Sequence, residues 1–210
     1  SVLSSKRPGD RILIVDDASG KTTADYLKRF SADHGAQLIR NEAPANGYCV
    51  SANKGMARAI NPYFLLLNSD TILTRDALEN MLRVALDYPG TGIVGPLSNA
   101  ASTQSIPDIV NTANQTAINE LPAGVTISDM NQLCQSWANG LPVPCVPLVH
   151  GFCQLIKREV FERIGGFDEE SFPQGYGEEN DFCIRASNAG YDLRIATSSF
   201  VFHAKSASYS

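Results

Sequence analysis

Two clusters of polar and acidic residues follow apolar segments, and their side chains are of types that bind cations. Asp16 and Asp17 come directly after the apolar run 11–15, and Asn68-Ser69-Asp70 comes directly after Tyr63–Leu67. Carboxylate oxygens are preferred ligands of the hard cations Mg²⁺ and Mn²⁺. A cation held at such a position would neutralise the charge of a phosphate group in a substrate.

Each of these clusters also has a purely structural interpretation. Asp70 is the candidate metal ligand, because a buried strand would fix its backbone and the neighbouring Ser69 and Thr71 add hydroxyl oxygens. The same residues fit an Asx-turn or a cap on the next helix. Asp16 and Asp17 fit hydrogen bonds to a nucleobase or ribose, and they also fit a loop with a helix N-cap. Spacing alone leaves these alternatives open.

A third acidic cluster lies at the expected start of a helix near the C-terminus. Glu178, Glu179 and Asp181 fall within four positions. Negative charge at a helix N-terminus is favourable by about 0.3–1 kcal/mol per group, and Asp181 can pair with Arg185 one turn later. Crowded carboxylates also raise one another's pKa, which suits a general base. The cluster is therefore either structural or catalytic.

Several familiar motifs are absent. There is no Gly-x-x-x-x-Gly-Lys-Ser/Thr loop, which would bind phosphate, and neither His-Glu-x-x-His nor Gly-x-Ser-x-Gly occurs. A protein of this kind that handles phosphate needs a cation instead. His203, which closes the last apolar strand, is either a structural residue or a ligand, whereas His34 and His150 lie in no informative pattern.

The elements that must position these groups alternate between strands and helices. This alternation predicts an α/β fold with a mostly parallel central sheet and helices on both faces. Ligands bind beyond the carboxyl ends of such strands, where the first two clusters lie. The expected strands are 11–15, 37–40, 63–67, 92–96 and 148–157 with a final pair at 193–196 and 200–203, and the expected helices are 22–33, 50–60, 75–86, 158–164 and 178–189.

Residues 97–147 differ in composition from the rest of the chain. They are rich in Ser, Asn, Thr and Pro, with a modest helical pattern near 127–137. A long irregular segment inside a compact domain is usually a functional loop or lid. Because no repeat or linker divides the chain, we expect a single domain over residues 1–210 that contains this segment as a lid.

Composition excludes several classes of protein. The 210 residues are 43% hydrophobic and carry a net charge of -5, which excludes a disordered chain and argues against nucleic acid as a partner. The apolar runs are strand-sized, far shorter than the roughly 20 residues of a membrane span, and no signal peptide is recognised. The five cysteines include no Cys-x-x-Cys pair, so free thiols in a reducing compartment are expected.

Taken in order along the chain, these segments resemble the inverting glycosyltransferases of family 2, which have the GT-A fold. The resemblance rests on segments 12–19, 46–55, 64–71, 151–158, 164–168 and 175–185, with Gly190-Tyr191 and His203. It implies transfer of a sugar from a UDP-, dTDP- or GDP-sugar to a glycan or lipid-linked acceptor. Bacterial surface polysaccharide synthesis, with rhamnose as the sugar, and a cytoplasmic location near the inner face of the membrane are expected.

The resemblance also implies roles for individual residues. Asp16 and Asp17 match the acidic pair near the base and ribose, and Asn46, Lys54, Asn68 and Ser69 complete the nucleotide-sugar site. Asp70 is the surviving carboxylate of the family's Asp-x-Asp motif, and with His203 it would hold Mn²⁺ or Mg²⁺ and the diphosphate. Glu179 is the expected general base, with Glu178 and Asp181 as further candidates.

The sequence departs from the family pattern in three places. Asn68 replaces the first carboxylate of the metal motif, and Glu179 replaces the usual aspartate. The family's first strand and helix have no counterpart before residue 11 beyond 1–5, which resembles the end of that helix, so a truncated domain with low activity is expected. A non-catalytic module that binds sugars or nucleotide-sugars is the main alternative.

A second alternative is a phosphatase of the haloacid dehalogenase type, because Asn68-Ser69-Asp70-Thr71 is similar to its Asp-x-Asp-x-Thr motif. That chemistry needs a nucleophilic carboxylate at position 68. An amide cannot form a phosphoaspartate, so Asn68 argues against it.

Overall fold

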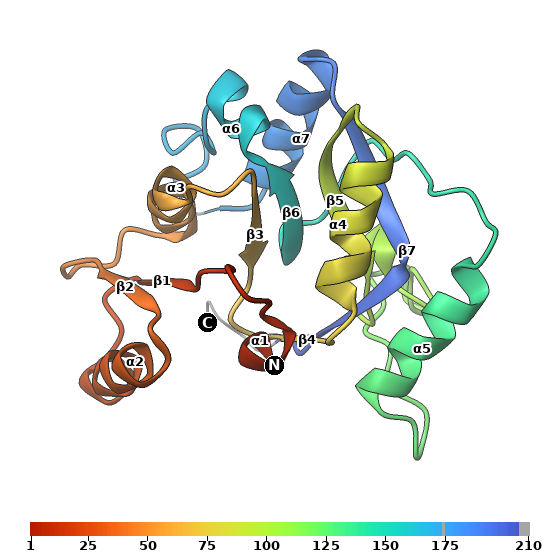
Figure 1. The fold of residues 1–210 in the computed structure, drawn as a ribbon, viewed down its shortest axis with the longest axis horizontal. Coiled ribbons are helices and arrows are strands. Elements are labelled where there is room, and N and C mark those ends of the chain that lie inside the picture. The colour runs from red at the N-terminus through yellow and green to blue at the C-terminus, as the bar shows by residue number, and fades with distance from the viewer. Residues whose placement is uncertain (174, 206–210) are drawn as a thin grey trace.

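The computed structural model describes residues 1–173 and 175–205, and it has an α/β fold with two sheets (Figure 1). The larger sheet has five strands in the order β3-β6-β5-β7-β4. Its strands are β3 (Tyr63–Leu67), β4 (Thr71–Leu73), β5 (Thr91–Leu97), β6 (Cys153–Lys157) and β7 (Asp192–His203).

The expected α/β class is confirmed, but the larger sheet is mixed and not mostly parallel. Only β5 and β7 pair in parallel; β6 is antiparallel to β3 and β5, and β4 is antiparallel to β7. An apolar strand that is covered on both faces has the same residue pattern in either direction. The long segment after β5 brings the chain back beside β5 at the end of the sheet where β5 finishes, so β6 runs antiparallel to it.

The smaller sheet contains β1 (Leu13–Asp16) and β2 (Gln37–Arg40), which pair in parallel. They are joined by α2 (Lys21–His34), which ends at Gly35 in the left-handed conformation, as the position of this glycine predicts. The next helix, α3 (Tyr48–Arg58), lies between the two sheets in sequence and contacts both β1 and β3. Figure 1 shows this smaller sheet beside β3.

Helices cover both faces of the larger sheet. On one face α3, α6 (Arg158–Ile164) and α7 (Glu178–Asn188) surround Ile93 of β5, and on the other face α4 (Ala77–Asp87) packs on Val94. The side chains of adjacent strand residues point to opposite faces, which is why these neighbours belong to different clusters. The short helix α1 (Val2–Ser5) contacts β4.

The last strand differs from its expected form. Instead of two strands, β7 runs unbroken from Asp192 to His203, with a shift in its register against β5 near Pro96. The polar residues Ser198 and Ser199 suggest a turn, but α4 supplies their partners. The Asn80 side-chain Nδ2 donates to the Ser198 backbone carbonyl at 2.9 Å, and the Ser199 hydroxyl donates to the Ala77 carbonyl at 3.0 Å.

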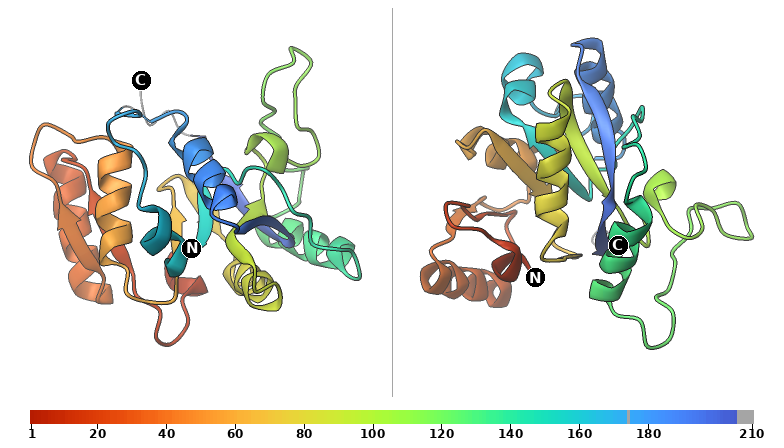
Figure 2. Two further views of the ribbon diagram at one scale, coloured as in Figure 1. Left: turned by 90° about the horizontal axis from the view of Figure 1, so that it is seen from above. Right: turned by 45° about the vertical axis from the view of Figure 1, so that its right-hand side comes forward.

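The segment between β5 and β6 contains the 3₁₀ turn η1 (Ser102–Gln104) and helix α5 (Ile127–Ala138). Thr126 and Asp129 form a capping box at the start of α5. Met130 and Cys134 then pack on Phe200 of β7. Figure 2 shows α5 along one side of the molecule, with the preceding loop extending away from the domain. No helix within residues 1–173 and 175–205 has the length and apolar composition needed to cross a membrane.

Candidate functional site

The first acidic cluster lies where β1 ends. Asp16 is buried, pairs with the Arg40 guanidinium at the end of β2, and accepts a hydrogen bond from the Ser19 amide at 3.0 Å. Burial alone would raise the pKa of Asp16, but the hydrogen bonds from Ser19 and the charge of Arg40 outweigh it and lower the pKa. Asp16 is therefore an ionised group whose oxygens are largely engaged within the protein.

Asp17 connects β1 to the loop before α3. Its carboxylate accepts hydrogen bonds from the Asn46 amide at 2.9 Å, the Gly47 amide at 2.8 Å and the Asn41 side chain at 2.7 Å. Burial alone would raise the pKa of Asp17, but these hydrogen bonds outweigh it and lower the pKa. Lys54 Nζ donates to the side-chain Oδ1 of Asn41 at 2.6 Å. Because Asn41 and Asn46 both donate to Asp17, the expected residues Asn46, Lys54 and Asp17 belong to one hydrogen-bond network.

Asp70 lies in the turn between β3 and β4, and His203 is the last residue of β7. Because Thr71 pairs with His203 in the sheet, Asp70 Oδ1 lies 3.5 Å from His203 Nε2, and both side chains are about nine-tenths buried. The Asn68 amide donates to the Phe152 carbonyl, and the Asn68 carbonyl accepts from the Thr71 hydroxyl, so the turn before Asp70 is fixed; Ser69 is exposed.

Three residues that sequence patterns did not single out hold His203 in place. The Asn99 side chain accepts from the His203 amide at 2.7 Å and donates to its carbonyl at 3.1 Å. His203 Nδ1 lies 2.9 Å from the Ala100 carbonyl, and the Phe152 ring stacks on the imidazole with centroids 5.1 Å apart. These contacts come from the 97–147 segment and from the start of β6, so no local pattern could have revealed them.

The geometry of this pair fits a divalent cation. With Nδ1 directed at the Ala100 carbonyl, a proton on Nδ1 leaves the Nε2 lone pair facing Asp70. An oxygen and a nitrogen 3.5 Å apart can both bind one ion. Within the described ranges no group of three or more His, Cys, Asp or Glu side chains could hold a metal. This suits Mg²⁺ or Mn²⁺, which often takes only one or two protein ligands beside substrate phosphates.

The three carboxylates of the third acidic cluster have different surroundings. Glu178 is buried, with Oε2 lacking a hydrogen-bond partner in the described part of the chain, and Glu179 is half-buried beside Gly151. Burial raises the pKa of Glu178; backbone hydrogen bonds oppose this and the charge of Glu179 adds to it. Asp181 instead accepts from Arg185 Nε at 2.7 Å.

The pairing of Asp181 with Arg185 has a structural purpose. The guanidinium also donates to the carbonyls of Ile164 and Gly166 at 2.8 Å, which fixes the loop after α6. The structure thus contains the ion pair between Asp181 and Arg185, one helical turn apart, that the sequence allowed.

A continuous path of contacts joins the three clusters. Gly47, which donates to Asp17, adopts a φ of +89°, and a Cβ atom on it would lie 3.0 Å from the Pro173 carbonyl. Cys49 donates from Sγ to the Phe172 carbonyl at 3.1 Å, so the loop before α7 adjoins the loop before α3.

From the start of α7 the path continues through the segment before β6. A Cβ atom on Gly151 would lie 3.5 Å from that of Glu179, and the next residue, Phe152, stacks on His203. The loop that binds Asp17 therefore contacts the loop before α7, and the segment beside Glu179 leads directly to the residue that stacks on His203.

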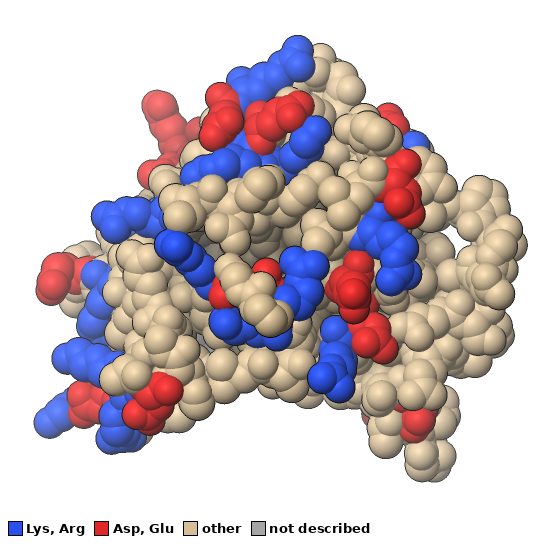
Figure 3. All heavy atoms as spheres, in the orientation of Figure 1, with Lys and Arg blue, Asp and Glu red and all other residues tan. Residues whose placement is uncertain are grey.

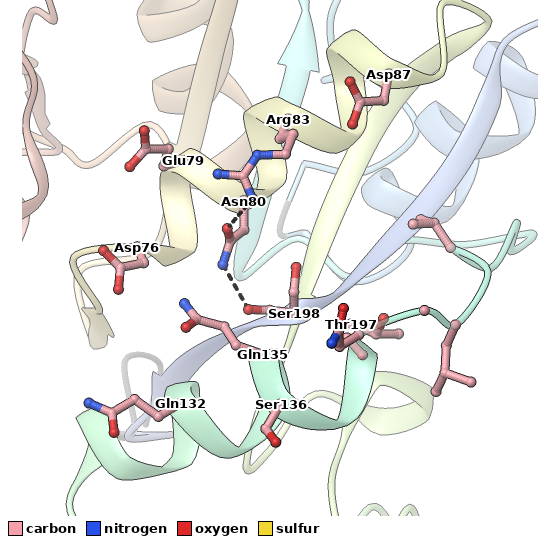
Figure 4. Close-up of a pocket in the computed structure, with 15 residues that line it drawn as sticks. Asp76, Glu79, Asn80, Arg83, Asp87, Gln132, Gln135, Ser136, Thr197 and Ser198 are labelled. Atoms are coloured by element: carbon pink, nitrogen blue, oxygen red, sulfur yellow. Dashed lines mark hydrogen bonds between the residues drawn. The ribbon is translucent and has the colours of Figure 1, made fainter.

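A separate groove of about 970 Å³ lies between α4 and α5 (Figure 4). Asn80, Arg83 and Ser198 are among its lining residues and bond to one another, while Gln132 and Gln135 approach from α5. None of the residues expected at the strand-end site lines it. On the face drawn in Figure 3, basic and acidic side chains are interspersed.

Two family models match the chain. The model of glycosyl transferase family 2 matches residues 1–109, and that of glycosyl transferase family group 2 matches residues 63–209. Over 94 residues, 45% of this chain and 23% of the relative, the chain is 30% identical to poly-beta-1,6-N-acetyl-D-glucosamine synthase of Staphylococcus epidermidis. Over 99% of its length it is 24% identical to the uncharacterized protein y4gI of Sinorhizobium fredii. The chain spans about a quarter of the length of these relatives.

Solved structures share the fold. A mannosyltransferase from Pyrobaculum calidifontis in complex with GDP-Man and Mn²⁺ is similar over 97% of this chain and 50% of its own, with a TM-score of 0.65 at 18% identity. GalNAc-T7 with UDP, GalNAc and Mn²⁺ is similar over 97% of this chain and 39% of its own, with a TM-score of 0.69 at 15% identity. At these identities the likeness is one of fold.

Proposed function

The chain belongs to glycosyl transferase family 2, and we propose that it transfers a sugar from a nucleotide-diphosphate-sugar to an acceptor hydroxyl with inversion at the anomeric carbon. The observation that carries this proposal is the pair of Asp70 and His203, whose side chains lie 3.5 Å apart where β7 ends beside the start of β4. A carboxylate and an imidazole supply only two ligands to a divalent cation, and the phosphate oxygens of the substrate would supply others. The GT-A fold of the chain supports the same conclusion.

Mn²⁺ or Mg²⁺ is the proposed cofactor, with Asp70 and His203 as its protein ligands. The donor set of one carboxylate oxygen and one imidazole nitrogen is suitable for either ion. When bound, the ion supplies positive charge that stabilises the departing nucleotide diphosphate. Asn68, which stands where the family has a carboxylate, reduces the negative charge of the site. Ala100 and Phe152 keep the imidazole oriented through the contacts described above.

Glu179 is the proposed general base. As the acceptor hydroxyl oxygen attacks the anomeric carbon, the Glu179 carboxylate takes the hydroxyl proton. The new glycosidic bond forms while the bond from the anomeric carbon to the diphosphate oxygen breaks, and the electron pair leaves with the diphosphate. Glu178 remains a further candidate because of its burial, and Asp181 acts through Arg185 to hold the loop after α6.

The nucleotide end of the donor is proposed to bind at the end of β1. Asp17 organises Asn46 and the loop before α3, while Lys54 supplies positive charge near Asn41. Asp16 supports this edge through Arg40. Ser69 is exposed. We propose that it contacts the donor, together with Asn68, between this site and Asp70.

The acceptor is proposed to be a glycan or a lipid-linked sugar in surface polysaccharide synthesis, and the donor sugar a hexose or a deoxyhexose such as rhamnose. Similarity to a polysaccharide synthase supports the polysaccharide role. We place the reaction in the cytoplasm beside the inner face of the membrane, which the five free cysteines support.

Calorimetry with UDP, GDP and dTDP, with and without Mn²⁺, tests this proposal. We expect one nucleotide to bind in a Mn²⁺-dependent manner, and Asp70→Asn or His203→Gln to weaken that binding about tenfold or more. The matched control Asp25→Asn, on α2, should bind as the unchanged chain does. Binding of all three nucleotides without regard to Mn²⁺ contradicts the metal assignment.

Turnover of the corresponding nucleotide-sugar tests the base. Glu179→Gln should bind the nucleotide normally and lose about 10²–10⁴-fold in transfer rate, the range that general bases contribute. Undiminished transfer by this variant would refute the assignment of Glu179. Mn²⁺-dependent binding of a nucleotide-sugar without any turnover would instead support the non-catalytic binding module.

A further inference from the structure

The groove of about 970 Å³ between α4 and α5 contains none of the residues of the strand-end site (Figure 4). Three stretches that are far apart in the sequence form its walls: α4, the second half of α5 with the turn after it, and the middle of β7. Its volume lies within the roughly 300–1,000 Å³ that ligand pockets usually have. The side chains that line it therefore indicate what class of molecule it would take.

The floor of the groove is a gap in the hydrogen-bonded ladders of β7. Among the described strands, β5 pairs with β7 at Ala196 and again at Phe200, and β4 pairs with β7 only beyond Phe200. Thr197 and Ser198 lie in this gap and line the groove. Two polar residues in the middle of β7 thus face a hollow and not a neighbouring strand.

Two side chains of α4 hold this floor in place. The buried Asn80 donates from Nδ2 to the Ser198 carbonyl at 2.9 Å, and Arg83 Nη1 donates to Asn80 Oδ1 at 3.1 Å. Figure 4 shows these three residues together in the groove. A floor that is fixed by hydrogen bonds within the protein is preorganised, as a binding site requires.

Two amide side chains enter the groove from α5 with their hydrogen-bonding groups unused. Gln132 is exposed and Gln135 is half-buried, and neither side chain bonds to any of the residues that the structure describes. Figure 4 shows Gln135 directed toward Asn80 and Ser198 across the groove. Each amide offers two N–H donors and a carbonyl acceptor, so the pair suits a ligand that both donates and accepts hydrogen bonds.

The charged residues of the groove argue against an ionic ligand. Glu79, Arg83 and Asp87 follow one another at one-turn intervals along α4, and Asp76 adds a further carboxylate at its N-cap. An anion would meet these carboxylates, and a cation would meet the guanidinium in the middle of the row. Because like charges brought together are costly, an uncharged ligand fits this groove best.

Apolar molecules and extended peptides fit the groove less well. Only Ala138, Leu141 and Val143 bring apolar side chains to its lining. A peptide that adds to a strand edge needs a row of free backbone groups. The gap in β7 is three residues long, and Asn80 already occupies the Ser198 carbonyl.

We propose that this groove is a second carbohydrate site, which binds a neutral oligosaccharide through the amides of Gln132 and Gln135. Sugar hydroxyls donate and accept hydrogen bonds and carry no charge, as the lining requires. The choice of a glycan among uncharged polar molecules rests on the proposed function, since a glycosyltransferase works beside its glycan acceptor or product. A second contact keeps a glycan near the strand-end site between reactions, because rebinding there is then intramolecular.

An NMR titration of the unsubstituted chain, without nucleotide or Mn²⁺, tests for this site. The probes are neutral hexasaccharides of glucose, mannose and N-acetylglucosamine, with hexagalacturonate as an anionic counterpart of the same length. We expect at least one neutral hexasaccharide to shift the side-chain amide signals of Gln132 and Gln135, and hexagalacturonate to shift neither.

Substitutions then locate the binding. Gln132→Ala and Gln135→Ala should each raise the Kd of that hexasaccharide about fivefold, which corresponds to the loss of one neutral hydrogen bond. Their melting temperatures should not fall, because neither side chain bonds to the described part of the protein. Gln37→Ala, which removes an exposed glutamine of β2 outside the groove, is the matched control and should leave the Kd unchanged.

Asp70→Asn separates this inference from the proposed function. It should weaken Mn²⁺-dependent nucleotide binding but leave the hexasaccharide Kd unchanged. No shift with any neutral hexasaccharide, tighter binding of hexagalacturonate, or a Kd that both glutamine variants leave unchanged overturns the second site alone. A groove that binds a neutral hexasaccharide in a chain with neither Mn²⁺-dependent nucleotide binding nor turnover upholds the site and overturns the proposed function.

Discussion

Glu178 and Glu179 are adjacent in the chain, but the fold gives them different surroundings. Glu178 is buried below the loop that precedes α7, with Gly175 near its carboxylate, whereas Glu179 is half-buried beside Gly151. A buried carboxylate is stabilised in its protonated form. Two adjacent carboxylates can thus take separate parts, because the protein encloses Glu178 and leaves Glu179 beside the segment before β6.

At the residue scale, we predict that Glu178→Gln stabilises the protein at neutral pH. Burial raises the pKa of Glu178 above the ordinary 4.5, so the folded chain holds this proton more tightly than the unfolded chain. Stability is therefore lost as pH rises from about 4.5 through the raised pKa, and ionised Glu178 is a net cost at pH 7. Urea unfolding at pH 7 should show a higher midpoint for Glu178→Gln, and this gain should vanish below pH 4.5.

Asp17→Asn is the matched control, because its effect has the opposite sign. Hydrogen bonds lower the pKa of Asp17 below the ordinary 3.8, so its contribution is present above pH 3.8 and is lost as pH falls through the lowered pKa. Asp17→Asn should destabilise the protein at pH 7 by about 2 kcal/mol, the loss of hydrogen bonds to a charged group. A Glu178→Gln variant that is less stable than the unchanged chain at pH 7 would show that ionised Glu178 has a stabilising partner.

At the scale of elements, helix positions could be predicted well and strand directions could not. The apolar spacing of 75–86 places a helix where α4 lies, within two residues, because helix periodicity is local. The direction of β6 depends on where a long connection returns, which no local pattern records. For the same reason Asp70 and His203 could be paired only through a resemblance, and Asn99 gave no signal at all.

The first residues of segment 97–147, the predicted lid, hold His203 of the proposed metal pair in place. Asn99 is buried and bonds both the amide and the carbonyl of His203. We predict that Asn99→Ala lowers stability by about 2–4 kcal/mol, because two buried backbone groups lose their partner. It should also weaken Mn²⁺-dependent nucleotide binding, measured by calorimetry at a temperature where the variant is folded.

The control for Asn99 comes from the same segment. Within the described residues, the Asn111 side chain bonds only the nearby residues 113 and 115 of its own exposed turn. Asn111→Ala should leave nucleotide binding unchanged. If Asn99→Ala is destabilised but binds nucleotide and Mn²⁺ as tightly as the unchanged chain, then Asn99 supports the fold and does not orient His203.

At the scale of the whole molecule, the sheet edges formed by β1 and β3 lack a partner strand within the described residues. Among the described strands β1 pairs only with β2, and β3 pairs on one side only, with β6. Every residue of β3 is apolar, as in a strand buried on both faces, yet all five are partly exposed. Apolar edges of this kind are normally covered, so we predict that another strand is able to pair with β3.

Hydrogen exchange measured amide by amide tests whether this edge is open. The Asn68 amide donates to Phe152 of the β6 side, and hydrogen-bonded pairs alternate along an antiparallel ladder. The amide of Leu66 therefore points to β6, whereas that of Leu65 points to the free edge. We predict that Leu66 is protected at least about tenfold more than Leu65, because an amide without a partner exchanges without any opening of the fold. Equal protection of the two amides would mean that another strand, from a longer form of the protein or from a second copy, already pairs with β3; protection of Leu65 that rises with protein concentration would identify the second copy.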